Sequence, residues 1–109
     1  MSEYRTDKIT NHIKELSANF IEHEAGPTSL ITVTRVLLSA DGKNATVMIS
    51  VLPREKEQAA YGFVRRNLGE LRKYVTKGLK VHPIPFLSVE IDEGEKNRQK
   101  IDELLHNSW

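Results

Sequence analysis

The chain has 109 residues, of which 39% are hydrophobic and 28% charged, with a formal net charge of +1; this composition is typical of one soluble globular domain. It contains no cysteine, which excludes disulfides, thiol nucleophiles and thiolate metal sites and fits a reducing compartment. No apolar run approaches the roughly 20 residues of a membrane-spanning helix, and the first residues lack a signal-peptide pattern. We therefore expect a single cytoplasmic domain over residues 1–109.

The first predicted element is a helix from about Tyr4 to Glu24. The Gly26-Pro27 pair ends it, because proline cannot continue a helix and disfavours the helical conformation of the preceding residue. Arg5 and Lys8 lie near its start, where positive charge opposes the helix dipole, so helix stability does not explain them. Apolar residues at spacings of four, three and four define the expected buried face: Ile9, Ile13, Leu16 and Phe20.

Two strands should follow, over residues 29–39 and 44–52. The first is rich in β-branched residues, and the second alternates between apolar and more polar positions. Asp41-Gly42 between them is a strong turn signal, so we expect an antiparallel hairpin with one face against helices. Ser39 and Asp41 bear a hydroxyl and a carboxylate, but in a turn such groups commonly bond to the backbone, and we interpret them as turn residues.

The segment from Ala59 to Pro85 has the pattern of a basic helix. Between residues 60 and 83 it carries six lysines and arginines and one acidic residue. The scarcity of acids favours an anion-binding face over an ordinary solvated surface, which would mix charges to gain i,i+4 pairs. Five apolar residues fall within an arc of about 80°, and the cations fall on a neighbouring arc of about 140°: Val64, Leu68, Leu71, Val75 and Leu79, then Arg65, Arg66, Arg72, Lys73, Lys77 and Lys80.

Glycines predict an interruption of this helix. A glycine in a helix costs about 1 kcal/mol relative to alanine and usually marks a kink or a close backbone approach. Gly69 is one candidate, and Gly62 carries the same signal nearer the start. Gly78 is expected to loosen the last turn.

Beyond the basic helix, Pro83 and Pro85 forbid further helix, and residues 86–92 alternate as a third strand. A strand that returns after a helical crossover should lie parallel to one of the first two. Residues 96–106 can form a short terminal helix. The expected fold is α+β, with a three-stranded mixed sheet and helices packed on one face, in the order α-β-β-α-kink-α-β-α.

The sequence offers no constellation for catalysis or for a metal. The four histidines lack companion ligands at metal-site spacings, and the glycines do not cluster into a phosphate loop or a dinucleotide fingerprint. The carboxylate pairs Asp92-Glu93 and Asp102-Glu103 are expected to keep the C-terminal end soluble. We expect no enzyme, no cofactor, no metal and no small-molecule substrate.

Motifs along the chain agree with one known family. Residues 33–47 match the pattern V-x-x-V-x-x-S-x-D-x-x-x-A-x-V. Pro85-Phe86-Leu87 leads through the third strand to Asp92, and Ile101 and Leu104-Leu105 follow. In order and spacing these motifs resemble the ribosome-binding factor A family over nearly the whole chain, and Arg5 and Lys8 fall where that family opens with Arg-x-x-Arg.

The resemblance implies a type-II KH-like fold in which a helix-kink-helix built on Ala-x-Gly replaces the usual glycine loop. Counting back from Pro85 places this motif at Asn67-Leu68-Gly69, with Asn67 in place of alanine, and Arg72 on the basic position three residues later. Ala60-Tyr61-Gly62 matches the letters better and the spacing worse, so we place the kink at Gly69. Gly26, where the family tends to have aspartate, and the missing basic tail are further departures.

The resemblance also implies a bacterial assembly factor that binds the 30S subunit and 16S rRNA, acts as a monomer in late assembly and in 5′-end maturation of 16S rRNA, and has no catalysis of its own. With only Tyr61 and Tyr74 in the basic region, we expect little stacking and recognition by rRNA shape and backbone. Together with the charge pattern, the resemblance predicts the following rRNA-binding residues: Arg5, Lys8, Arg65, Arg66, Arg72, Lys73, Lys77 and Lys80.

Two other functions remain open at this point. A generic KH-like module would bind short single-stranded RNA without preferring the ribosome, so oligonucleotides competing with purified subunits would identify it. A protein-interaction domain would dock through the acidic C-terminal helix and Trp109, and would bind its partner at high salt without RNA.

Overall fold

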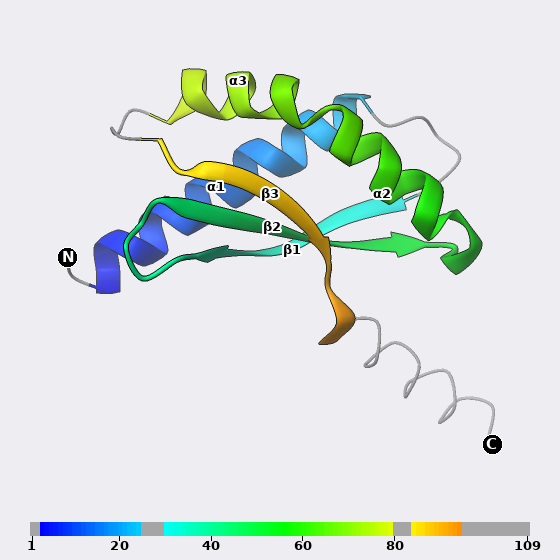
Figure 1. Ribbon diagram of the computed structural model, residues 1–109, viewed down its shortest axis with the longest axis horizontal. Coiled ribbons are helices and arrows are strands. Elements are labelled where there is room, and N and C mark those ends of the chain that lie inside the picture. Colours follow the sequence, from blue (N-terminus) through cyan, green and yellow to red (C-terminus); the bar gives the residue numbers. More distant parts are fainter. Residues whose placement is uncertain (1–2, 25–29, 80–83, 95–109) are drawn as a thin grey trace.

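The computed structural model describes residues 3–24, 30–79 and 84–94, with side chains from residue 7 onward (Figure 1). The predicted terminal helix over residues 96–106 lies outside the described residues. The elements are α1 (Glu3–Glu24), β1 (Leu30–Leu38), β2 (Asn44–Leu52), the short 3-10 helix η1 (Arg54–Lys56), α2 (Glu57–Arg66), α3 (Leu68–Gly78) and β3 (Phe86–Ile91).

The three strands form one mixed sheet in the order β1-β2-β3. β1 pairs antiparallel with β2, as the hairpin prediction required, and β3 runs parallel to β2. The connection between β2 and β3 is long enough to contain α2 and α3, which is what a parallel pair demands. Both the hairpin and the parallel third strand are confirmed.

The hairpin turn is closed by the two residues interpreted as turn residues. The Ser39 hydroxyl donates to Asp41 Oδ1 at 2.6 Å, and the same oxygen accepts the backbone N–H of Lys43 at 3.0 Å. These two hydrogen bonds, the Ser39 contact first, favour the ionised form and lower the pKa of Asp41 below its usual value of 3.8. Gly42 has a φ of 73°, a left-handed conformation that glycine adopts without strain.

All the described helices pack on one face of the sheet. α1 lies against β1, α2 and α3 lie toward β2 and β3, and α1 meets α3 above the sheet (Figure 1). β2 supplies every second residue to the core because successive side chains of a strand point to opposite faces. The buried hydrophobic residues are Ile13, Ile21, Val33, Val36, Ala45, Val47, Ile49, Val51, Ala60, Val64, Leu71, Val75, Leu79, Leu87 and Val89.

The buried face of α1 differs from the predicted one. Ile13, Ser17 and Ile21 are its most buried residues, at spacings of four. Ile9, Leu16 and Phe20 are only half-buried and pack around the edge of the core. The prediction, made from apolar residues alone, placed the buried face of α1 to one side of the observed one. It did so because Ser17, a small polar residue, occupies the middle of that face.

A β-bulge in β1 interrupts the alternation of side chains between the two faces of the sheet. Val33 pairs with Ile49 and Arg35 with Met48, so Thr34 is an extra residue in β1. Val33 and Val36 are both buried, although an unbroken alternation would place them on opposite faces. The bulge was not predicted from the sequence.

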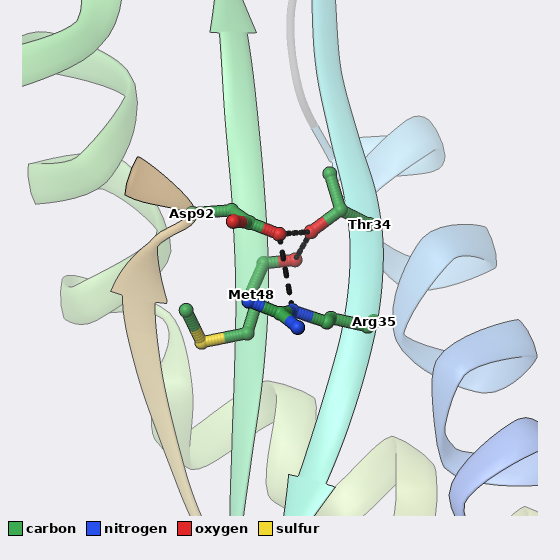
Figure 2. Close-up of polar contacts among 4 residues, drawn as sticks. All are labelled: Thr34, Arg35, Met48 and Asp92. Carbon is green, nitrogen blue, oxygen red and sulfur yellow. Dashed lines mark hydrogen bonds and ion pairs between the residues drawn. The ribbon is translucent and has the colours of Figure 1, made fainter. Parts of the chain in front are cut away.

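Asp92, directly after β3, holds this bulge in place (Figure 2). The Thr34 hydroxyl lies 2.6 Å from Asp92 Oδ2 and 3.2 Å from the carbonyl oxygen of Met48. Arg35 Nε lies 3.3 Å from the same carboxylate oxygen. Asp92 is only 4% exposed, so its expected role as a solubilising surface residue is wrong. Both of these side-chain contacts come from β1, and Thr34 lies 58 residues earlier in the chain.

Candidate nucleic-acid interface

The basic helix is divided into α2 and α3 by a bend at Asn67 (Figure 1). The backbone N–H of Asn67 donates to the carbonyl oxygens of Phe63 and Val64 at 3.2 and 3.1 Å, and its carbonyl accepts Leu71 N–H at 2.9 Å. The Asn67 side-chain amide also donates to Phe63 O, at 2.8 Å. Asn67 therefore closes α2 with its side chain and begins α3 with its backbone.

The bend lies within the predicted Asn67-Leu68-Gly69 motif, at its first residue and not at its glycine. Gly69 lies within α3, two residues after the bend, and a Cβ there would meet nothing within 4 Å. Gly62 lies inside α2. The close approach is instead at Gly78, where a Cβ would lie 2.6 Å from Leu16 Cδ2 of α1. Gly78 thus permits α3 to contact α1.

Across the bend, the predicted apolar and basic faces stay separate. Val64, Leu71, Val75 and Leu79 are buried and Leu68 is half-buried. All the cations of α2 and α3 are exposed: Arg65, Arg66, Arg72, Lys73 and Lys77.

Carboxylates neutralise little of this surface within the described residues. Lys73 Nζ lies 3.5 Å from Glu70 Oε1, with both side chains mostly exposed. Such a pair is weak and exchanges readily with solvent or with another anion. The described parts of α2 and α3 thus keep a strong excess of positive charge.

The remaining predicted residues are less fully placed. Lys8 is exposed on α1, two turns before Leu16, or about 12 Å along the helix axis from the contact with α3. Arg5 belongs to α1, but its side chain is not among those described. Lys80 lies outside the described residues.

A groove of about 470 Å³ runs between the bent helices and β3. Arg65 and Arg72, which are seven residues apart in sequence, both line it. The Arg72 guanidinium lies 4.6 Å from the centre of the Phe86 ring, and that of Arg65 lies 5.8 Å from the Tyr61 ring. The lining residues are Tyr61, Arg65, Leu68, Gly69, Arg72, Phe86, Leu87, Ser88, Val89 and Glu90.

Sequence reasoning missed the contribution of β3 to this groove. Phe86 is 55% exposed at the start of β3, and only the fold brings it beside α3. In the alternation of the strand it occupies a position opposite to the buried Leu87, so its exposure could have been inferred. Its position under Arg72 could not.

The groove also faces an edge of the sheet. Phe86 N–H and Asp92 N–H donate toward β2, to the carbonyl oxygens of Lys43 and Ile49. Backbone groups alternate in direction along a parallel strand, so those of Leu87 and Val89 point away from β2, toward the groove. The Tyr61 hydroxyl, 3.5 Å from Val89 O, occupies part of this edge.

Two further findings concern metal binding and membrane-spanning helices among the described residues. They contain no group of three or more histidine, aspartate or glutamate side chains placed to hold a metal ion. None of their helices is long and apolar enough to cross a membrane.

Comparison with known proteins places the chain in a family. A family model described as ribosome-binding factor A matches residues 5–105. The chain belongs to the ribosome-binding factor A family. The ribosome-binding factor A of Thermosipho africanus is 31% identical over 109 residues, covering 94% of this chain and 86% of the relative. That of Clostridium botulinum strain Hall is 28% identical over 111 residues, covering 98% and 92%.

Solved structures agree with this assignment at the level of the fold. The crystal structure of ribosome-binding factor A from Thermus thermophilus has a TM-score of 0.69 at 22% identity and covers 78% of this chain and 93% of that chain. The solution structure of a Thermotoga maritima protein, described as a putative ribosome binding factor A, has a TM-score of 0.68 at 24% identity and covers 83% and 89%. The α+β fold with a three-stranded mixed sheet is confirmed.

A third similar structure is a homology model of the Thermus thermophilus factor, fitted into a cryo-electron microscopy map of a complex of 30S with that factor. Its TM-score is 0.57 at 23% identity, and the match covers 74% of this chain and 88% of that chain.

Proposed function

We propose that this protein is a cytoplasmic, monomeric assembly factor that binds the 30S ribosomal subunit through 16S rRNA. In this proposal it assists late assembly and 5′-end maturation of the rRNA without catalysing a reaction and without a cofactor. Membership of the ribosome-binding factor A family supports the ribosomal partner, as does the 30S complex reported for the Thermus thermophilus factor.

One observation carries the assignment of the binding surface: the five exposed cations of α2 and α3, of which only Lys73 contacts a carboxylate among the described residues. Phosphates of an RNA backbone are the anions that such a surface suits best. Each phosphate that a lysine or arginine neutralises releases counterions condensed on the RNA, which favours binding. The positive end of the α3 dipole adds to the attraction at the bend. The Asn67 side chain does not cap this end, since it bonds back to Phe63.

Recognition by a basic helix surface predicts a strong dependence on salt. Arg72 and Lys73 are exposed on α3, so replacing both with glutamate should change the charge of the surface without disturbing the core. We expect affinity for the small subunit to fall at least tenfold, and the slope of log affinity against log salt to decrease by about two. Thermal unfolding should stay within about 2 °C of the wild type, because exposed substitutions have small effects. Sedimentation with purified 30S subunits across a salt series measures both quantities.

The matched control reverses the exposed Lys14 of α1 and Lys56 of η1, which changes the net charge equally but lies outside α3 and the groove. Its slope should remain near that of the wild type. If both double variants bind alike, the surface is assigned wrongly. If the wild type binds subunits with no salt dependence, a protein contact rather than rRNA carries the binding.

A further inference from the structure

The groove beside β3 contains a guanidinium group that lies over an aromatic ring. The Arg72 guanidinium lies over the Phe86 ring at 4.6 Å from its centre. Pro85 and Leu87 on either side of Phe86 are buried, so the backbone that carries the ring is anchored. A cation over an aromatic face is attracted by the negative charge of that face, and a guanidinium can also stack on the ring, so this contact favours a position of Arg72 over Phe86.

The polar groups of the groove differ between its two walls. The helix wall carries Arg65 and Arg72, and the strand wall carries Ser88 and Glu90. The Glu90 carboxylate repels phosphates and can only accept hydrogen bonds, which the amino groups of bases donate. An RNA strand bound here would therefore have its phosphates toward the helices and its bases toward β3.

Two other occupants suit the groove less well. In a duplex the bases are stacked inside the helix, out of reach of a side-chain plane in a groove. A peptide strand pairing with β3 would have to lie about 4.8 Å from it, yet the Tyr61 hydroxyl is 3.5 Å from Val89 O along that edge. A flat, unpaired base is smaller, and at Gly69 no side chain obstructs its approach to the start of α3.

Resting on the proposed function, we propose that the groove takes an unpaired segment of RNA and that one base stacks on the Arg72 guanidinium, with Phe86 positioning that plane from beneath. Arg72 then acts through its planar shape and not through its charge alone. Arginine planes and aromatic rings stack bases in this way in single-stranded RNA recognition. The sequence led us to expect little stacking; the proposal adds one defined stacking site, half of it contributed by β3.

The test separates shape from charge at one position. Arg72→Lys keeps the charge and removes the plane, and Phe86→Leu keeps an apolar side chain and removes the ring. The probes are a short unstructured RNA with one 2-aminopurine, whose fluorescence falls when it stacks, and a hairpin RNA with the same number of phosphates. Tyr74→Leu is the control, because Tyr74 is a half-exposed aromatic of α3 that pairs with Phe20, outside the groove.

We expect the wild type and Tyr74→Leu to quench the 2-aminopurine on binding. Both groove variants should lose the quenching and bind the unstructured RNA roughly fivefold to tenfold more weakly. Arg72→Lys should bind the hairpin with unchanged affinity and salt slope, because its charge is retained. Thermal unfolding of each variant identifies any loss that comes from misfolding, and the exposed Arg72 decides the matter if Phe86→Leu is unstable.

Full quenching and affinity in Arg72→Lys would overturn the stacking site and leave the proposed function intact. Quenching by all variants alike would place the base elsewhere and also reject it. Wild-type protein that sediments with 30S subunits but binds neither RNA would reject both the stacking site and rRNA as the partner.

Discussion

The two ends of α3 carry the same residue type in opposite surroundings. At the start of the helix, a Cβ on the exposed Gly69 would meet nothing within 4 Å, while at the end a Cβ on Gly78 would lie 2.6 Å from a methyl group of Leu16. The first end borders the groove, and the second packs against α1. Thus the close packing at Gly78 holds one end of α3 against α1, and the other end leaves its backbone open beside the groove.

The contrast between the two ends predicts that stability and binding respond to different substitutions along one helix. Val75 and Leu79 near the anchored end are buried, and Arg72 and Lys73 toward the open end are exposed. The buried face also includes Leu71 near the open end, and the exposed face includes Lys77 near the anchored end. Changes to the buried residues should therefore affect unfolding, and changes to the exposed cations should affect RNA binding.

The largest effect on stability should come from emptying the anchored end. Val75→Ala removes two methyl groups from a fully buried site, which should lower the free energy of unfolding by about 2 kcal/mol. Urea denaturation measures this loss. The salt dependence of RNA binding, measured well below the denaturation midpoint, should not change. A loss below about 0.5 kcal/mol would contradict tight packing at this end.

Exchanging each glycine for alanine tests the contrast directly and should give effects of opposite sign. Gly78→Ala forces Leu16 to move and should cost about 1 kcal/mol, the low end for overpacking because Leu16 is half-buried. Gly69→Ala gains helix propensity with no contact to disturb and should stabilise by up to about 1 kcal/mol. Thermal and urea unfolding of the two variants, side by side, measure the difference. Shifts of the same sign would show that the two ends are equivalent.

The smallest effect should come from the hairpin turn, which belongs to neither end of α3. The lowered pKa of Asp41 means that its hydrogen bonds stabilise the folded state above pH 3.8, and that this contribution is lost as the pH falls through the folded-state pKa. Asp41 is fully exposed, so the effect is slight. The stability difference between the wild type and Asp41→Asn should therefore be present at about pH 6 and shrink below pH 3.8, as measured by urea unfolding. A difference that grows in acid would reverse the assigned sign.

The sequence was sufficient for features that depend on neighbouring residues. The hairpin, its turn, the strand Asn44–Leu52 and the apolar face from Val64 to Leu79 all follow from local periodicity and turn chemistry. The parallel third strand followed from the helical crossover. In each case the residues that predict the feature lie within one continuous segment of the sequence.

What the sequence could not supply are contacts between elements. The Thr34 bulge depends on a carboxylate 58 residues away, and the Arg72 plane depends on a ring brought to it by the fold. The bend was expected at a glycine for conformational freedom, but it is made by the hydrogen bonds of Asn67. Patterns in a single sequence describe one helix or strand at a time, so they could not predict the groove between α2, α3 and β3.

The bond between Thr34 and Asp92 joins strands that are not neighbours, since β2 lies between β1 and β3. Opening of the bulge would remove one of the contacts that hold the end of β3, whose backbone is otherwise bonded to β2. Amide hydrogen exchange at the two outer strands should therefore be coupled, with protection lost in both by a single local unfolding event.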